Sequence, residues 1–282
     1  MSWHGRLQLD YRLEADERGA APRTIGIDRH EGPLRVLQRL YPEGPAVCHH
    51  VLVHPPGGIA GGDTLEVDAR LDAGTHALLT TPGATRFYRS DGAVAAQHVR
   101  LRLAAGARVE WLPLEAIAYD GCLAENHVRL ELEPGAEAIG WDLLALGLPA
   151  AGQPFRRGHV LQHLELAGRW LERGRIDAAD TLLLDAAAGW AGHRVCATLW
   201  FASGSGWSRA RRDALLEAAR AAVEASPLAP GAGASAPDAQ VVVLRALADR
   251  VEPAMRLLAD VRAAWRRGAW GLDAATPRIW RT

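Results

Sequence analysis

The sequence predicts a mainly β protein: a β-superhelix, or solenoid-like stack of strand pairs, with two C-terminal α-helices covering one side. Two observations predict this fold class. Three successive segments repeat one pattern of alternating strand, glycine-centred turn and second strand. The last third of the chain instead carries two stretches whose apolar residues recur at helical spacing.

The repeated pattern is clearest in the middle of the chain. Its turns are centred on Gly74, Gly106 and Gly135, roughly 30 residues apart. In VRLRL and VRLEL, which precede the second and third turns, every second residue is apolar, as in a strand with one buried face. Units of this length cannot bury their apolar face alone, so we expect them to stack on one another. The three copies occupy residues 67–82, 99–114 and 128–143.

Alternation of apolar and polar residues continues on both sides of the repeat, which indicates further strands. Expected strands before the repeat lie at residues 6–12, 36–40 and 48–54. Expected strand pieces after it lie at residues 159–166 and 168–184, with another strand pair at residues 189–201.

Two helices are expected in the C-terminal third. The first covers residues 208–225, with an apolar face that includes Leu215. The second opens at Asp249, where Glu252 stands at the capping-box position, and stops at Gly268. Because an uncovered sheet edge invites aggregation, we expect both helices to cover one face or an open end of the β-structure.

The remaining C-terminal segments are expected to be irregular or short. PLAPGAGASAP at residues 227–237 predicts a flexible loop, and a strand follows it at residues 240–247. We expect one domain, residues 1–282, with a β-rich body at about 1–205 and helical elements at about 207–268.

The overall composition excludes several function classes. A net charge of −1, from 32 basic and 33 acidic residues, gives no electrostatic case for nucleic acid or an anionic membrane. Cys48, Cys122 and Cys196 are too few and too widely spaced for a disulfide framework or a C-x-x-C metal site. No segment has the features of a secretory signal, and no apolar run approaches the ~20 residues that span a bilayer. We therefore expect a cytoplasmic protein.

The most unusual stretch is HPPGGIAGGD at residues 54–63, hereafter the glycine-rich run. Its two prolines and four glycines indicate a shaped backbone. TTPGATRFYRS at residues 80–90, hereafter the second run, follows it. GGIAGGDT matches the phosphate loop G-x-x-x-x-G-K-[ST] except that Asp63 replaces the required lysine, and the chain contains no lysine. Nucleotide binding at this run is therefore not expected.

The histidines near the glycine-rich run lie too far apart for one ion if the segment is a strand. His50 and His54 would share a face at ~13 Å from each other. Cys48 and His50, ~7 Å apart on one face, would need outside ligands to share a metal. These spacings favour ordinary strand histidines over a tight metal site, and the same two interpretations apply to His159 and His163.

Asp63, at the end of the glycine-rich run, has two interpretations. It either accepts backbone hydrogen bonds in a turn or presents a carboxylate near Arg86 and Arg89. A row of carboxylates next to turns and strand ends would line a path for a hard or borderline divalent cation. The alternative hypothesis is a metal-dependent enzyme using carboxylates and histidines near the run, although no nucleophile is identifiable. The candidate path residues are Asp63, Asp120, Asp142 and Glu172.

Aromatic residues suggest a surface for protein partners. Most of the ten tryptophans are expected in the core, and Trp280 is expected to anchor the C-terminus on the body. Tryptophan and arginine are also enriched at interface anchors, and the FYR sequence of the second run is a candidate hot spot. The candidate partner-binding residues are Phe87, Tyr88, Arg89, Trp265 and Trp280.

Several longer motifs occur together and in order. They are HPPGGIAGGD, LLTTPGATRFYRS, a W-L-P-x-E segment at residues 111–115, AYDG, GWDLLALG and a terminal PRIW. With this combination the chain, from about residue 40 to its end, resembles the urease accessory protein UreD family, called UreH in some bacteria. The resemblance implies a mostly β, superhelical fold with two helices, and no enzymatic activity.

The same resemblance implies a urease maturation factor. It implies a non-catalytic scaffold or metallochaperone that binds apo-urease and, through the accessory protein UreF, the GTPase UreG. It implies that nickel travels to the urease active site along an internal path, with no permanently bound cofactor. It further implies that the helical C-terminal portion contacts UreF. The scattered carboxylates agree with transient ion passage.

Overall fold

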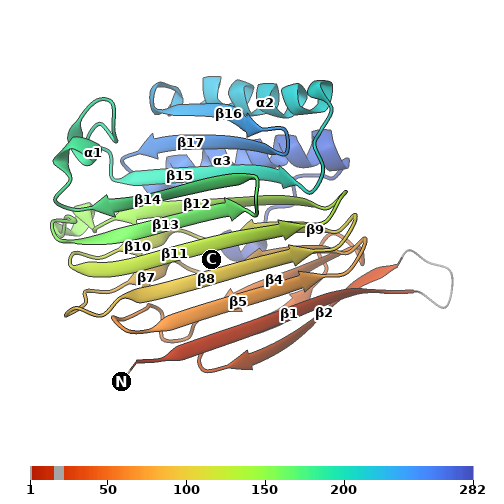
Figure 1. Ribbon diagram of the computed structural model, residues 1–282, viewed down its shortest axis with the longest axis horizontal. Helices are drawn as coiled ribbons and strands as arrows, with labels where there is room; N and C mark the ends of the chain where they lie inside the picture. The colour runs from red at the N-terminus through yellow and green to blue at the C-terminus, as the bar shows by residue number, and fades with distance from the viewer. Residues whose placement is uncertain (1, 16–21, 282) are drawn as a thin grey trace.

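The computed structural model describes residues 2–15 and 22–281, and their strands form two β-sheets that face each other (Figure 1). Across sheet A the strand order is β14 (Trp170–Asp177), β13 (Gly158–Leu166), β11 (Cys122–Leu132), β8 (Ala95–Leu103), β5 (Thr64–Leu71), β1 (His4–Glu14) and β2 (Arg23–Glu31). Across sheet B it is β16 (Ala232–Asp238), β17 (Val241–Ala248), β15 (Val195–Ser203), β12 (Glu137–Leu146), β9 (Arg108–Leu112), β6 (His76–Thr80), β4 (Val47–Val53) and β3 (Arg35–Leu40). Two short strands, β7 (Thr85–Phe87) and β10 (Ala116–Ala118), pair beside β12.

The chain passes from sheet A to sheet B at each predicted glycine turn, so consecutive repeats stack as parallel strands. β5, β8 and β11 pair in parallel in sheet A, as β6, β9 and β12 do in sheet B. Gly74, Gly106 and Gly135 occupy the turns with φ of 73°, 70° and 82°, the left-handed region that favours glycine. The turns lie one above another, since a Cβ on Gly135 would stand 3.6 Å from the Gly106 nitrogen. The predicted superhelical stack of strand pairs is confirmed.

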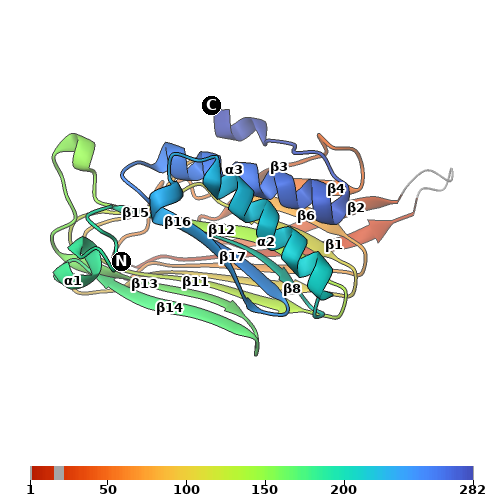
Figure 2. The same ribbon diagram turned by 90° about the horizontal axis from the view of Figure 1, so that it is seen from above.

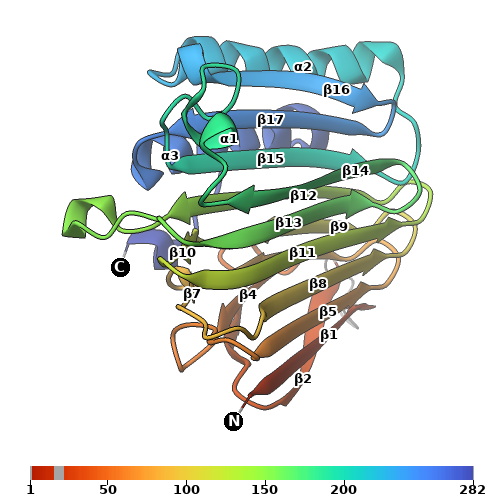
Figure 3. The ribbon, with the colours of Figure 1, turned by 60° about the vertical axis from the view of Figure 1, so that its left-hand side comes forward.

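The helices cover sheet B and leave the outer face of sheet A open (Figures 2 and 3). α2 (Arg209–Glu224) and α3 (Val251–Trp265) contact each other, and α3 packs on β12, β15 and β17. The described residues also include a short helix, α1 (Thr181–Asp185), so they contain three α-helices rather than the predicted two. The two long helices lie together on one side of the stack, as predicted.

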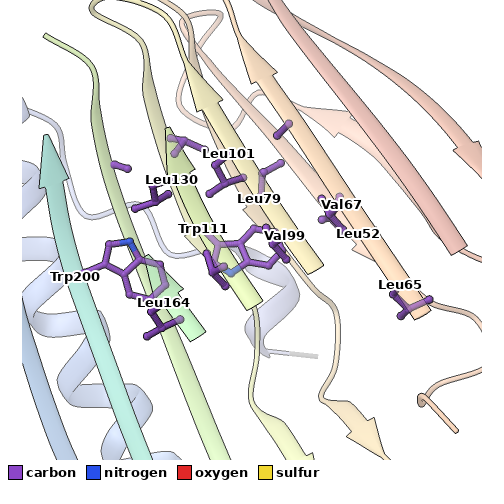
Figure 4. Packing of buried hydrophobic residues seen from close by; sticks show 14 of the residues in the cluster. Leu52, Leu65, Val67, Leu79, Val99, Leu101, Trp111, Leu130, Leu164 and Trp200 are labelled. Carbon is purple, nitrogen blue, oxygen red and sulfur yellow. The ribbon is translucent and has the colours of Figure 1, made fainter. Parts of the chain in front are cut away.

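Two apolar layers result from this arrangement. One fills the space between the sheets and includes Leu79, Leu101 and Trp111 (Figure 4). The other lies between sheet B and the helices, around Trp141 and Trp265. Strands of sheet B are therefore buried on both faces, which explains why β12 reads as an apolar run rather than an alternating one.

Three predictions for the segments between residues 181 and 238 are wrong because local capping and tertiary pairing override composition. The predicted loop at residues 227–237 contains β16, an edge strand antiparallel to β17. Its Pro237 falls within a register shift, where a missing N–H is tolerated. The strand piece predicted near residue 181 is α1, capped by Asp180, which accepts the Leu183 N–H at 2.9 Å. Residues 189–201 contribute one strand, β15, preceded by a turn, rather than a strand pair.

The predicted ends of the second long helix are also wrong. α3 begins at Val251, and no side chain caps it, because the Asp249 carboxylate bonds His193 at 2.7 Å instead. At its other end the helix passes the predicted stop at Gly268 as a π-helical turn, Arg266–Trp270, and ends at Gly271 with φ of 64°.

A buried carboxylate ties α3 to sheet B. Glu110 of β9 is fully buried, and both Arg262 and Arg266 pair with it, Arg262 Nε at 2.6 Å from Oε2. His76 Nε2 lies 3.2 Å from the same carboxylate. Although burial alone would raise the pKa of Glu110, the charge of Arg262, the His76 hydrogen bond and the charge of Arg266 hold it well below its usual range.

Glu110→Ala should lower the free energy of unfolding by about 3–5 kcal/mol, because the buried Arg262 guanidinium would lose its counter-charge and the buried Arg266 would keep only Glu43. Urea denaturation followed by tryptophan fluorescence measures the change. The matched control is Glu31→Ala at the exposed end of β2, which should shift stability by less than about 0.5 kcal/mol. Equal effects of the two variants would show that the ion pairs do not hold α3.

Candidate functional site, an interior polar belt behind the glycine-rich run

The two runs fold onto each other. The Ile59 N–H donates to the Arg86 carbonyl over 2.7 Å, and the Tyr88 N–H donates to the Ile59 carbonyl over 3.0 Å. Glycine is required at position 58 because a Cβ there would lie 2.3 Å from the Tyr88 ring. The glycine-rich run and the second run therefore form one structural unit.

A cavity of about 250 Å³ lies between this unit and the inner faces of the sheets. Both runs line it, together with Gln97 of β8 and Trp111 of β9. His54 also lines it, and burial lowers the pKa of that imidazole against the opposing charge of Asp63. Gln97 is the polar side chain through which the cavity connects to the interior of the sandwich.

A chain of hydrogen bonds leads inward from the cavity. Gln97 Nε2 donates to Asn126 Oδ1 over 3.1 Å, and Asn126 Nδ2 donates to Asp142 Oδ1 over 2.7 Å. Gln162 donates to the other oxygen of Asp142. The three amides stand in register on β8, β11 and β13 of sheet A, whereas Asp142 reaches them from β12 of sheet B.

Beyond this hydrogen-bonded chain lies an ion pair between β14 and β17, whose carboxylate, Glu172, acts on Asp142 through its charge. Glu172 of β14 pairs with Arg245 of β17 through two hydrogen bonds, one of 2.9 Å, so the pair bridges the two sheets. Both side chains are partly exposed to solvent. We call the whole set the polar belt: Gln97, Asn126, Gln162, Asp142, Glu172 and Arg245.

Asp142 is the electrostatic centre of the polar belt. It is buried, and burial raises its pKa to about 7, an effect that the Asn126 hydrogen bond opposes and the Glu172 charge increases. Cys196 is also affected by these charges, since burial and the nearby carboxylates raise the pKa of its thiol to about 12. Near pH 7 the Asp142 carboxyl can therefore take up or release a proton.

The structure separates the other two predicted path carboxylates from the polar belt. Asp63 accepts the Trp3 N–H at 2.7 Å and the Ala60 N–H at 3.1 Å. Of its two predicted roles, it therefore has that of a hydrogen-bond acceptor in a turn. Asp120 accepts the backbone N–H groups of Arg156 and Arg157 at 2.8 Å and pairs with the Arg157 guanidinium. Both carboxylates are used to fix loops, so of the four predicted residues only Asp142 and Glu172 come together.

Burial excludes two of the five predicted partner-binding residues from surface contact. Phe87 and Trp265 are fully buried, and the Trp265 indole donates to the Leu215 carbonyl at 2.8 Å, so both belong to the core. Tyr88 is partly buried, and Arg89 is exposed. Trp280 is partly buried, and its indole N–H donates to Thr80 Oγ1 over 2.7 Å. This contact anchors the C-terminus on the body of the protein, as predicted.

The histidines of β4 have protein partners. His49 Nε2 lies 2.7 Å from Glu43, and His50 Nδ1 bonds the Tyr11 hydroxyl at 2.7 Å. Within residues 2–15 and 22–281, no three His, Cys, Asp or Glu side chains stand ready to hold one metal ion. In the same part of the chain, no helix has the length and apolar character needed to cross a membrane.

Comparison with known proteins decides the family. A family model described as "UreD urease accessory protein" matches residues 4–281. The chain belongs to the UreD family. It is 66% identical over 282 residues to the urease accessory protein UreD of Leptothrix cholodnii and 60% identical over 282 residues to that of Variovorax paradoxus, with full coverage of both chains in each case. The UreD of Paracidovorax citrulli is 58% identical over 280 residues, with 99% of each chain covered.

Membership in the UreD family makes this chain a urease accessory protein, as the sequence motifs predicted. The sequence predicted the two carboxylates of the polar belt but not its three amides, Gln97, Asn126 and Gln162. A signal was present: each of β8, β11 and β13 carries an amide followed by histidine, in QHV, NHV and QHL. In every case the amide replaces an apolar residue at an inward-facing position.

The raised pKa of Asp142 predicts a pH-dependent loss of stability in this UreD-family protein. Between about pH 4 and pH 7 the folded state keeps a proton that the unfolded state releases, so stability falls as pH rises through this window. In the wild type the free energy of unfolding should fall by an amount on the order of 3 kcal/mol across this window, and in the Asp142→Asn variant this fall should be absent. Denaturation midpoints across pH 4–8 measure it, with Asp10→Asn on the outer face of β1 as control. Parallel profiles for wild type and Asp142→Asn would contradict the assignment.

Proposed function

We propose that the chain is a urease maturation factor, a non-catalytic scaffold that binds apo-urease and the accessory proteins UreF and UreG and helps deliver nickel. Nickel is the cargo of this process and not a resident cofactor. The polar belt is the route along which the ion passes, and the protein acts in the cytoplasm. Family membership supports the accessory role, and the polar belt supports the route.

The extent of the polar belt across the interior is the observation that carries this proposal. Its polar groups extend from the cavity at the glycine-rich run to the partly exposed Glu172–Arg245 pair at the opposite side of the interior. The apolar residues around it make any isolated charge costly, so an ion would be restricted to the oxygen atoms of the belt.

The chemistry of the donors suits passage better than retention. Asp142 supplies one buried carboxylate, and the amide side chains beside it can turn their carbonyl oxygens toward a cation. One carboxylate with neutral oxygens binds a borderline ion such as Ni²⁺ modestly. Because the pKa of Asp142 is raised to about 7, an arriving cation would displace a proton that the carboxyl loses readily at neutral pH.

The side of the molecule formed by α2 and α3 is the surface we assign to UreF. The two helices lie together over sheet B (Figure 2). α2 keeps arginine and glutamate side chains exposed along its outer side, including the Arg220–Glu217 pair. A contact there would leave both ends of the polar belt outside the helical layer.

Asp142→Ala and Glu172→Ala should each preserve the accessory complex while lowering nickel delivery severalfold. The two readouts are co-purification with UreF, UreG and apo-urease, and the nickel content of the urease after maturation. Glu31→Ala, which changes an exposed carboxylate at the end of β2, is the matched control and should match wild type in both.

If urease matured with Asp142→Ala and urease matured with Glu172→Ala both contained as much nickel as with wild type, the proposed nickel route would be wrong. Failure of the wild-type chain to restore urease activity in a urease operon lacking its own copy would overturn the accessory proposal itself, provided that the chain is folded.

A further inference from the structure

We propose that the outer face of sheet A carries a binding site for a borderline divalent cation, formed by His98, His127 and Glu125. Two of these residues belong to a row of three histidines, His98, His127 and His163, which we call the histidine row. The site lies on the face opposite the polar belt, and no helix of residues 2–15 and 22–281 covers that face (Figure 3).

The strand repeat itself places the histidine row. In β8, β11 and β13 each inward-facing amide of the polar belt is followed by a histidine, and alternation along a strand turns that histidine outward. The parallel register sets His98 opposite His127 and His127 opposite His163. The ring centroids are 4.7 Å and 5.2 Å apart, with interplanar angles of 32° and 30°.

One imidazole and one carboxylate already stand at ligand spacing. His127 Nε2 lies 3.1 Å from Glu125 Oε2. Two donors bonded at about 2.1 Å and at a right angle on one ion lie about 3.0 Å apart, so this pair matches two adjacent coordination positions. The second imidazole, His98, comes from the neighbouring strand, and its environment includes the Glu125 charge.

The side chains must turn before all three donors converge, because the planes of the His98 and His127 rings are tilted by 32° and, among the described residues, no three such side chains are placed to hold one ion. Rotation is open to them since His98 is exposed and His127 is only half-buried. Two imidazoles and a carboxylate form a donor set that suits Ni²⁺, Zn²⁺ and Cu²⁺.

Glu165 is a weaker candidate than Glu125 although it also bonds a histidine of the row. Its two oxygens accept from Arg129 at 2.9 Å and 2.8 Å, so its charge is already neutralised by a guanidinium. Among the described contacts Glu125 bonds His127 and no arginine. The cation therefore belongs at the His98 end of the row, with His163 stacked on the far side of His127.

Titration of the full-length protein with Ni²⁺ alone, and separately with Zn²⁺ alone, tests the site by calorimetry with a competing chelator. His127→Gln and His98→Gln should each weaken the affinity of one bound ion by at least about tenfold. His30→Gln, an exposed histidine at the end of β2 in the same sheet, is the matched control and should bind like wild type. Circular dichroism checks the fold, and Glu125→Gln provides a third variant that keeps both rings.

The outcomes separate this site from the proposed nickel route. Loss of an ion in the two histidine variants, with Asp142→Ala binding like wild type, supports the outer site. Equal binding by wild type, His127→Gln and His98→Gln overturns it, as does a bound ion that is lost only in Asp142→Ala.

Discussion

The buried Glu110 carboxylate is the interaction on which the arrangement of the layers depends. It receives Arg262 of α3 and Arg266 of the following π-helical turn, and Arg266 also reaches Glu43 in the turn between β3 and β4. Three segments far apart in the sequence are thus held at one point inside sheet B and its helical cover. Removing any one member would leave the others buried and charged, so the network makes the position of α3 nearly all-or-none. With α3 fixed there, one sheet face is covered and the other stays open.

Because the helices cover only sheet B, the repeated strands of sheet A have a buried inner face and an open outer face, and the two faces differ in chemistry. Each amide–histidine step in β8, β11 and β13 sends a neutral polar group into the sandwich and an imidazole to the surface. Inside, where an unpaired polar group is costly, the amides bond one another and Asp142. Outside, where water screens charge, the histidines contact one another and bond neighbouring carboxylates. One short sequence pattern, repeated at the spacing of the superhelix, therefore produces both the polar belt and the histidine row.

The sequence predicted the fold class well because its signals are local. Gly74, Gly106 and Gly135 mark turns whose backbone needs positive φ, and alternation marks the strands between them. It failed where tertiary pairing decides, as for β16, whose Gly/Ala/Pro composition forms a strand only because β17 offers an edge. In the polar belt, Asp142 and Glu172 were predicted as acidic residues near strand ends, but their meeting with Gln97 and Asn126 depends on how the two sheets face each other. Asp63 and Asp120 looked equivalent to them in sequence, yet backbone N–H groups occupy both.

Closing the polar belt tests most directly whether nickel crosses the interior through it. Asn126→Leu replaces the amide between the cavity and Asp142 with an apolar side chain of similar size, and it leaves both carboxylates and the helical cover intact. The measurement is the nickel content of urease matured with this variant, in samples where the accessory complex co-purifies as it does with wild type. A severalfold decrease in nickel per urease is the predicted result. Wild-type nickel content with an intact complex would contradict the route.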